Sequence, residues 1–251
     1  MNKPAFVIGT GPSLSGIDME ALSQYDCITF NRAYIAYEDW GFVPKYYLAI
    51  DGNDIRAMYK DLNSIIDKYE NTKFFILDDE KLNSIHPAES FQDCDKKISL
   101  FDWTKPNLYR IKRSSGYFSS FIDGKTMSLP IDLPNAGWQG IEVLYALGYK
   151  QIGFVGCDSR YRDDAKSNKD IDTRTREYVS SADSDINHFR PDYFGKGIRF
   201  GKPNPSQIIS VWKNGADKLP VDLELTSCTP DSAVNPWYTY VDFDEFIMDK
   251  K

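Results

Sequence analysis

The chain has 251 residues, of which 41% are hydrophobic and 27% are charged, and its formal net charge is −7. This composition is typical of a soluble globular protein and excludes a disordered chain. The negative charge argues against a general nucleic-acid-binding protein, whose affinity rests on many phosphate contacts from Lys and Arg. A single nucleotide needs only a few local donors, so a nucleotide ligand stays open.

The N-terminal segment predicts neither secretion nor insertion into a membrane. Its apolar run, residues 4–8, is too short for the core of a signal peptide, and no stretch approaches the ~18 apolar residues of a spanning helix. The widely spaced Cys27, Cys94, Cys157 and Cys228 predict free thiols in or near the core. We therefore expect a cytoplasmic protein with at most peripheral contact with a membrane.

Short apolar runs recur along the chain and predict buried strands. The early runs are four or five residues long and show no clean alternation, as in strands that are buried on both faces of a parallel sheet. The predicted strands, in chain order, span residues 5–8, 27–30, 46–50, 74–77, 98–101, 152–155 and 221–225. The last run alternates between apolar and polar residues, so we expect it towards an edge of the sheet.

The segments between these runs predict helices at residues 17–23, 55–69, 137–147 and 205–217. The third is the best defined, because Asn135 can cap it and Gly148 can end it. Strands that alternate with helices predict an α/β fold with one mostly parallel, doubly wound sheet. The chain has no internal repeat and no Pro/Gly/Ser-rich linker, so we expect a single domain over residues 1–251.

Residues 159–200 differ in composition from the rest of the chain. They contain nine basic and eight acidic residues and almost no aliphatic ones, too little apolar area for an independent layer. The segment predicts either a solvated surface insertion or a lid, because long loops in compact domains often cover active sites. Its position directly after a strand favours a flexible lid, at about residues 159–190.

The clearest local motif is the turn VIGTGPSL, residues 7–14, which follows the first predicted strand. Gly9 and Gly11 allow a tight turn, Ser13 can cap the helix that follows, and the N–H groups of the loop would face an anion. The turn is neither a Walker P-loop nor a dinucleotide fingerprint, because it lacks Gly-Lys-Ser/Thr and a third glycine. The pattern alone leaves a structural turn and a nucleotide site open.

Polar residues stand at the predicted carboxyl ends of several strands, where open parallel sheets bind their ligands. These residues are Thr10, Asn31, Asp51, Asn53 and Asp158. Each alone could be a helix cap or a turn residue, but together they predict a binding site. The neighbouring acids Asp51 and Asp54 also leave a Mg²⁺ site open.

Two histidines are candidates for acid–base chemistry. His86 precedes Pro87 in a polar stretch and is expected at the surface. His188 stands where the charged segment returns to the body, and an imidazole there could accept a proton near neutral pH. A structural histidine is the alternative. We expect the charge of the neighbouring Arg190 to keep the imidazole neutral.

Taken together, these motifs resemble the small bacterial sialyltransferases that decorate lipooligosaccharide. The turn from Gly9 to Leu14 is similar to the family's Gly-Asn-Gly-Pro-Ser-Leu, and an Ile-Asp follows in both. Further similar segments are Phe30-Asn31-Arg32, Asn135-Ala136-Gly137, Ala146 to Lys150, Gly156-Cys157-Asp158 and Asn187-His188-Phe189. Their order and spacing hold from residue 4 to about residue 190.

The resemblance implies a single Rossmann-like domain of variant GT-A type, with a flexible lid and no metal or other cofactor. It implies an inverting transfer of a 2-keto acid sugar, sialic acid-like or Kdo-like, from a CMP donor to a hydroxyl of a glycan or glycolipid. His188 would be the general base, and Arg160, Tyr161 and Arg162 would stabilise the departing phosphate. The implied donor-binding residues are Gly9, Thr10, Gly11, Ser13, Asn31, Asp51, Asn135, Ala136, Gly137, Gly156 and Asp158.

The chain departs from the family pattern at three donor-binding positions. Thr10 and Asp51 replace asparagines and Ala136 replaces a serine, so Asp51 would bind hydroxyls rather than a phosphate. Two other interpretations stay open. One is a Mg²⁺- and ATP-dependent enzyme like the pterin diphosphokinases, with Asp51 and Asp54 as metal ligands. The other is a non-catalytic nucleotide-binding module, and the oligomeric state, a homo-oligomer included, is open as well.

Overall fold

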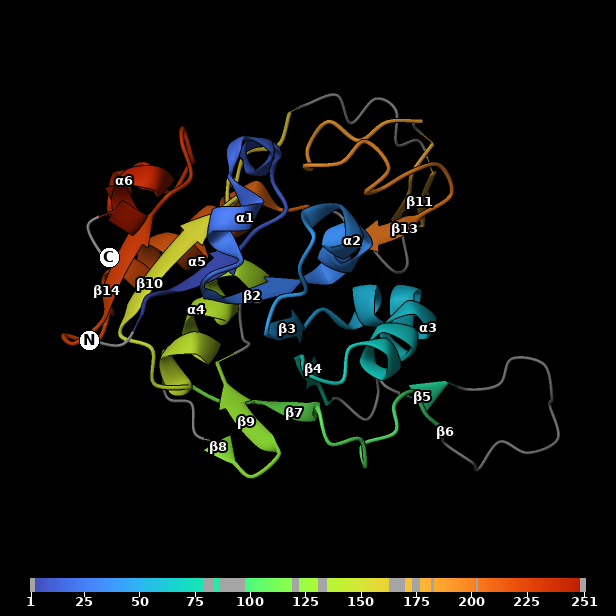
Figure 1. The fold of residues 1–251 in the computed structure, drawn as a ribbon. Helices are drawn as coiled ribbons and strands as arrows, with labels where there is room; N and C mark the ends of the chain where they lie inside the picture. The colour runs from blue at the N-terminus through green and yellow to red at the C-terminus, as the bar shows by residue number, and fades with distance from the viewer. Residues whose placement is uncertain are drawn as a thin grey trace, which may run out of the picture.

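The computed structural model describes residues 3–78, 84–85, 98–118, 122–130, 135–162, 170–172, 177–181, 183–201 and 203–248. Its main sheet consists of β1 (Ala5–Ile8), β2 (Asp26–Phe30), β3 (Tyr46–Ala49), β4 (Lys73–Leu77), β7 (Leu108–Arg113), β8 (Ile122–Asp123), β9 (Thr126–Leu129), β10 (Gln151–Val155), β14 (Glu224–Ser227) and β15 (Thr239–Tyr240). Their order across the sheet is β15-β14-β10-β1-β2-β3-β4-β7-β9-β8 (Figure 1). Neighbouring strands are parallel except β8 and β9. The predicted mostly parallel α/β sheet is confirmed.

Helices and turns cover both faces of this sheet. The described α-helices are α1 (Met19–Leu22), α2 (Tyr37–Trp40), α3 (Gly52–Lys68), α4 (Ala136–Ala146), α5 (Pro205–Ala216) and α6 (Phe243–Met248). In β1, Ala5 and Val7 belong to the core that includes residues of α3, α4 and α5. Phe6 and Ile8 belong to a second core, which α6 helps to close. The sheet is therefore doubly wound, as predicted. No helix among the described residues is both long enough and apolar enough to cross a bilayer.

The direction of winding reverses between β1 and β10. β2, β3 and β4 follow β1 in sequence on one side of it, whereas β10 and β14 lie on the other side. Ile8 and Val155, the last residues of β1 and β10, are register partners. Ligands of such sheets bind beyond the carboxyl ends of the strands at this point of reversal. The segments that follow Ile8 and Val155 therefore border the expected binding crevice.

A small antiparallel sheet lies in the region of the predicted lid. Its strands are β11 (Asp170–Asp172), β12 (Glu177–Val179) and β13 (Arg199–Gly201), and β13 contacts α3 (Figure 1). In the register of the three strands, Ile171 pairs with Tyr178 and Tyr178 pairs with Phe200. Residues 163–169, 173–176 and 182 of the predicted lid lie outside the described residues. Its movement stays a prediction.

The predicted strand at residues 98–101 does not join the main sheet. β6 (Ile98–Ser99) pairs only with β5 (Ser84–Ile85) in the described part of the chain. Leu100 and Phe101 are buried beyond the strand, and the Leu100 carbonyl accepts a hydrogen bond of 2.9 Å from Asn63 Nδ2 of α3. The prediction of a strand is therefore confirmed only for Ile98 and Ser99, whereas Leu100 and Phe101 belong to a loop that packs against α3.

Three strands near the edges also differ from the predictions. β7 and β9 were missed, because strand prediction relied on apolar runs and β7, with its exposed Lys112 and Arg113, is buried only in part. β14 begins at Glu224, three residues later than predicted, because Leu223 N donates to Pro220 O in a turn. The predicted free thiols are confirmed for Cys27, Cys157 and Cys228, which are buried, whereas Cys94 lies outside the described residues.

Candidate functional site

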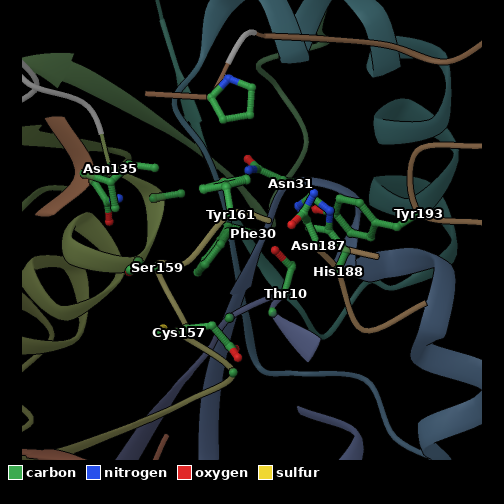
Figure 2. A pocket seen from close by; sticks show the side chains of 18 of the residues that line it. Thr10, Phe30, Asn31, Asn135, Cys157, Ser159, Tyr161, Asn187, His188 and Tyr193 are labelled. Carbon is green, nitrogen blue, oxygen red and sulfur yellow. The ribbon is translucent and has the colours of Figure 1, made fainter. Parts of the chain in front are cut away.

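A cavity lies beyond the carboxyl ends of β1, β2, β3 and β10, beside the first turn of α4 (Figure 2). Thirteen of the fifteen predicted site residues line it. They are Gly9, Thr10, Gly11, Asn31, Asp51, Asn135, Ala136, Gly137, Gly156, Asp158, Arg160, Tyr161 and His188. The other two, Ser13 and Arg162, are not among its described lining residues. The structure thus brings most of the predicted residues to one place, while their roles stay predictions.

The glycine turn after β1 is fastened to the end of β10 by its backbone. Gly9 N donates to Val155 O and Gly11 N donates to Gly156 O, both at 2.8 Å. A Cβ atom at Gly9 would lie 2.2 Å from the Gly156 oxygen, so only glycine fits there. The parallel hydrogen-bond ladder therefore continues past the strand ends and occupies these N–H groups. The prediction that they face an anion was wrong for Gly9 and Gly11.

Ser13 and Asp158 form a bracket behind this turn. Ser13 Oγ donates to Asp158 Oδ2 at 2.7 Å, and Ser13 N donates to Asp158 Oδ1 at 3.3 Å. The turn continues into a 3-10 helix, η1 (Pro12–Gly16), which has no side-chain cap. The predicted capping role of Ser13 was therefore wrong, because its hydroxyl is engaged by Asp158 instead. A Cβ atom at Gly11 would lie 1.9 Å from Asp158 Oδ2, which accounts for that glycine.

Asn31 begins the 3-10 helix η2 (Asn31–Ala36) directly after β2 and lines the cavity. Its φ angle of 53° is in the left-handed region, which asparagine tolerates better than most other residues. The Tyr47 hydroxyl donates to the Asn31 carbonyl and supports this conformation. Such backbone conformations concentrate at binding sites, where the surrounding structure holds them in place.

Asp51 lies at the boundary between β3 and α3. The Ile55 N–H donates to its carbonyl at 2.9 Å, and the Asp54 N–H donates to its Oδ1 at 3.3 Å. Asp51 thus supports the first turn of α3, and the helix begins at Gly52, three residues before the predicted start. One carboxylate oxygen is engaged by the helix, so a role towards a ligand remains a proposal. The side chain of Asn53 lies outside what the structure describes.

The first turn of α4 forms one side of the cavity, where Figure 2 shows Asn135. Asn135 Oδ1 accepts from Trp138 N at 2.9 Å, and Asn135 N donates to Gln139 Oε1 at 2.7 Å. The predicted cap is confirmed. Ala136 and Gly137 follow, and the N–H groups of a first helical turn have no intrahelical acceptors and carry partial positive charge. This end of the cavity therefore suits a phosphate or another anion.

His188 lies on the opposite side of the cavity, with Asn187 and Tyr193 beside it in Figure 2. Its ring stacks on Tyr193, with 4.2 Å between centroids and 9° between planes, and meets the edge of Phe194 at 4.9 Å. Nδ1 is 2.7 Å from Asp185 Oδ2, and the imidazole side chain is only 10% exposed. The ring is therefore fixed in place, and Nε2 is the nitrogen that remains for a ligand.

Asp185 determines which nitrogen of His188 carries the proton. Burial would raise the pKa of Asp185, but hydrogen bonds from His188 and from the backbone of Asn187 and Phe194 lower it below its ordinary value. Asn187 N, for example, donates to Asp185 Oδ1 at 2.8 Å. An ionised Asp185 accepts a hydrogen bond from Nδ1–H and leaves Nε2 as a proton acceptor. The sequence analysis missed this residue, although its place three positions before His188 was a usable signal.

The guanidinium of Arg190 is held by two carboxylates and a backbone carbonyl. Its Nε and Nη2 donate to the two carboxylate oxygens of Asp192 at 2.8 and 2.9 Å. Its Nη1 donates to Ile35 O at 3.1 Å and also pairs with Asp39. The charge is thus balanced by two carboxylates, and the residue fastens the segment around His188 to η2 and α2. The predicted influence of its charge on His188 stays a prediction.

The three residues predicted to support a leaving phosphate occupy different environments. Arg160 lines the cavity, and its Nε donates to Asp231 O at 2.6 Å. Burial, with smaller contributions from Asp54 and Asp185, raises the pKa of Tyr161 to about 12. Tyr161 is therefore a protonated hydrogen-bond donor at neutral pH. Arg162 is exposed outside the cavity wall, and its backbone N donates to Asn187 Oδ1 at 2.7 Å.

The fold resembles that of a solved glycosyltransferase. The MAf glycosyltransferase from Magnetospirillum magneticum AMB-1 aligns with a TM-score of 0.54 and 16% identity over 96% of this chain. The alignment covers 34% of that protein, so this chain spans about a third of its length. The sialyltransferase CstII from Campylobacter jejuni, solved with cytidine-5'-monophosphate, aligns with a TM-score of 0.44 and 14% identity over 95% of this chain and 84% of its own. Neither protein-family models nor curated protein sequences match this chain.

At these identities the likeness to the MAf glycosyltransferase shows the fold alone, a Rossmann-like α/β fold. Sequence analysis also missed the apolar end of the cavity, which Pro203, Ile208 and Trp212 form near α5. These residues stand outside the strand-end motifs, and only the packing of α5 against α4 brings them to the site. The cavity therefore combines an apolar end, a helix N-terminus and a fixed histidine.

Proposed function

We propose that this chain is an inverting glycosyltransferase that moves a 2-keto acid sugar from a CMP donor to a hydroxyl of a glycan or glycolipid. The observation that carries the proposal is the Asp185–His188 pair, which holds an imidazole on the wall of a cavity at the point where the sheet reverses. The likeness in fold to a glycosyltransferase supports the reaction class. The resemblance of the turn motifs to CMP-sugar enzymes supports the donor.

His188 would act as the general base on the acceptor. In the proposed step Nε2 takes the proton of the acceptor hydroxyl while its oxygen attacks the anomeric carbon of the donor, and the bond from that carbon to the CMP phosphate oxygen breaks. Removal of the proton in the transition state contributes typically about 10²- to 10⁴-fold to the rate. Asp185, through its 2.7 Å contact with Nδ1, would hold the ring in the productive tautomer and stabilise the charged form that follows.

Two side chains and one helix end would stabilise the leaving CMP. The phenol of Tyr161 and the Nη groups of Arg160 can donate to the phosphate oxygens on which charge develops. The first turn of α4, at Ala136 and Gly137, offers backbone N–H groups to the same anion. Charge on the phosphate is thus balanced by side chains and a helix end, so the proposed mechanism has no metal-dependent step.

The proposal is tested by measuring thermal stabilisation of the protein by CMP, UDP and GDP at equal concentrations. A ligand that binds only the folded state raises its stability in proportion to RT ln(1 + [L]/Kd). We expect a clear rise in Tm with CMP and little change with UDP or GDP. Release of CMP from CMP-N-acetylneuraminate, with and without a glycan acceptor, then tests the reaction. Equal stabilisation by UDP would contradict the CMP assignment, and failure to release CMP would contradict the proposed transfer from this donor.

A further inference from the structure

A second cavity adjoins the first on the side of α3. The two cavities share Asn31, Asp54 and Phe194 as lining residues. The Phe194 ring stacks on Phe200, with 4.2 Å between centroids and 13° between planes, and its edge contact with His188 spans 4.9 Å. A ligand that extends from the second cavity into the first therefore crosses a rim beside the proposed base.

Arg32 supplies a fixed cation to this second cavity. Its Nε donates to Tyr193 O at 2.8 Å, and its backbone N donates to the Tyr193 hydroxyl at 3.2 Å. In the part of the chain that the structure describes, no carboxylate lies within ion-pair distance of the Arg32 guanidinium. Asp192, whose pKa is lowered by its hydrogen bond with Arg190 and to a smaller extent by the charge of Arg32, is paired with Arg190. Because Nε is engaged, the two Nη groups form the edge that remains for an anion with two oxygens.

Apolar side chains form much of the remaining lining of the cavity, which also includes Asn31 and Asp54. Ala57 and Met58 contribute from α3, and Ile198 contributes from the turn before β13. A pocket with one fixed cation and several apolar side chains matches a sugar that has an anionic substituent, because sugar rings present C–H faces beside their polar groups. Asp54, at the rim shared with the first cavity, would be placed near ring hydroxyls rather than near the anion.

We propose that the second cavity is the acceptor subsite and that it binds a sugar with an anionic group, a carboxylate or a phosphate, through Arg32. The inference rests on the proposed function, because it assigns the second substrate of the same reaction. The anionic group pairs with the Nη edge of Arg32, the ring lies against Met58 and Ile198, and the reacting hydroxyl reaches His188 across the rim at Phe194.

The binding test measures by NMR how tightly the whole protein, without any donor, binds three probes. The probes are methyl glucuronide, methyl glucose 6-phosphate and methyl glucoside. We expect at least one anionic glycoside to bind about tenfold more tightly than the neutral one, as for a hydrogen bond to a charged group. A preference for one of the two anions assigns the carboxylate or the phosphate. Equal binding of all three glycosides overturns the inference.

Variants locate this binding in the molecule. Arg32→Gln should remove the preference for an anion, and Arg32→Lys should restore part of it. Ala57→Trp, at an exposed position of α3 that lines the cavity, should weaken binding of the anionic glycoside, whereas Lys60→Trp, an exposed control on the same helix, should not. An anion preference that survives Arg32→Gln, or binding unchanged by Ala57→Trp, overturns the inference.

Binding and cleavage of the donor serve as the control that separates the proposed acceptor subsite from the proposed glycosyltransferase function. CMP binding and CMP release without an acceptor should be the same in Ala57→Trp and in the unmodified protein. If Ala57→Trp instead weakens binding of CMP-N-acetylneuraminate, the cavity belongs to the donor and the acceptor assignment is overturned. If glycosides bind as expected but no CMP-sugar is cleaved, the proposed function fails, while the anionic sugar site at Arg32 stands on its own.

Discussion

The glycine turn after β1 and the segment 185–194 border the same cavity, but they are held in different ways. In the turn, the N–H groups of Gly9 and Gly11 donate hydrogen bonds to the end of β10, and the hydroxyl of Ser13 donates to Asp158. In the segment, the side chains of Asp185 and Tyr193 hold the ring of His188 in place, and these contacts leave Nε2 for a ligand. The glycine turn, which is the more conspicuous motif in the sequence, therefore mainly shapes the site. The less conspicuous segment 185–194 supplies the proposed reactive group, His188.

The comparison predicts that changes in the segment lower turnover, whereas changes in the turn lower stability. Apart from changes at His188 itself, the largest effect is expected for Asp185→Asn, which replaces the carboxylate that accepts from His188 Nδ1–H. With the wrong tautomer or orientation favoured, turnover should fall by at least about tenfold, a part of the 10²- to 10⁴-fold that a general base contributes. The measurement is CMP release at saturating donor. Turnover within the error of the unmodified protein would contradict the positioning role.

Gly11→Ala is expected to lower the stability of the protein rather than its turnover. Its Cβ atom would lie 1.9 Å from Asp158 Oδ2, so the bracket between Asp158 and Ser13 must shift. We expect the free energy of unfolding to fall by about 1–3 kcal/mol, as for other overpacked sites. Gly16→Ala is the matched control, because its Cβ atom would meet no atom within 4 Å. Equal denaturation midpoints for the two variants would contradict this account of the turn.

A smaller effect on turnover is expected for Tyr161→Phe, which removes one donor to the leaving phosphate. The loss should be several-fold, because a neutral hydrogen bond contributes about 0.5–1.5 kcal/mol. Burial raises the pKa of Tyr161 from 10.0 to about 12, so the phenol keeps its proton well into the alkaline range. The rate of the unmodified protein should therefore show no loss from Tyr161 ionisation below pH of about 10. A Tyr161-dependent decline between pH 8 and about 9 would contradict this environment.

No effect is expected from a chelator. The proposed step uses Tyr161, Arg160 and the first turn of α4 to balance the phosphate charge, so CMP release should persist in excess EDTA. A kinase that transfers a diphosphate from ATP would stop, since it needs Mg²⁺ bound to the nucleotide phosphates. Loss of activity that Mg²⁺ restores would favour that alternative, with Asp51 and Asp54 as the ligands to examine first.

The centre of the fold was predictable because its strands are buried on both faces. The apolar runs at residues 5–8, 27–30, 46–50, 74–77 and 152–155 correspond to β1, β2, β3, β4 and β10. Strands nearer the edges, such as β7, present a partly exposed face and give no apolar run. The run at residues 98–101 adds no strand to the main sheet for the converse reason, because Leu100 and Phe101 are buried beside a helix rather than by strand neighbours.

The candidate site was predictable where it follows from the topology of a parallel sheet. Residues directly after strands, such as Thr10, Asn31 and Asp158, must gather at one edge, and the structure places them there. Asp185 and Trp212 were missed, because their approach depends on how a segment and a helix pack against the body. The hydrogen-bond partner of Ser13 was also not predictable from the sequence, because the pattern around Ser13 does not distinguish a hydroxyl that donates to Asp158 from one that caps a helix.

The most direct test of the account is the turnover of His188→Ala, measured as CMP release in the presence of acceptor, with CMP binding determined in parallel. The account predicts a fall in turnover of at least about a hundredfold, with CMP binding nearly unchanged because Nε2 serves the acceptor. A His188→Ala protein that retains a large fraction of the turnover would contradict the account.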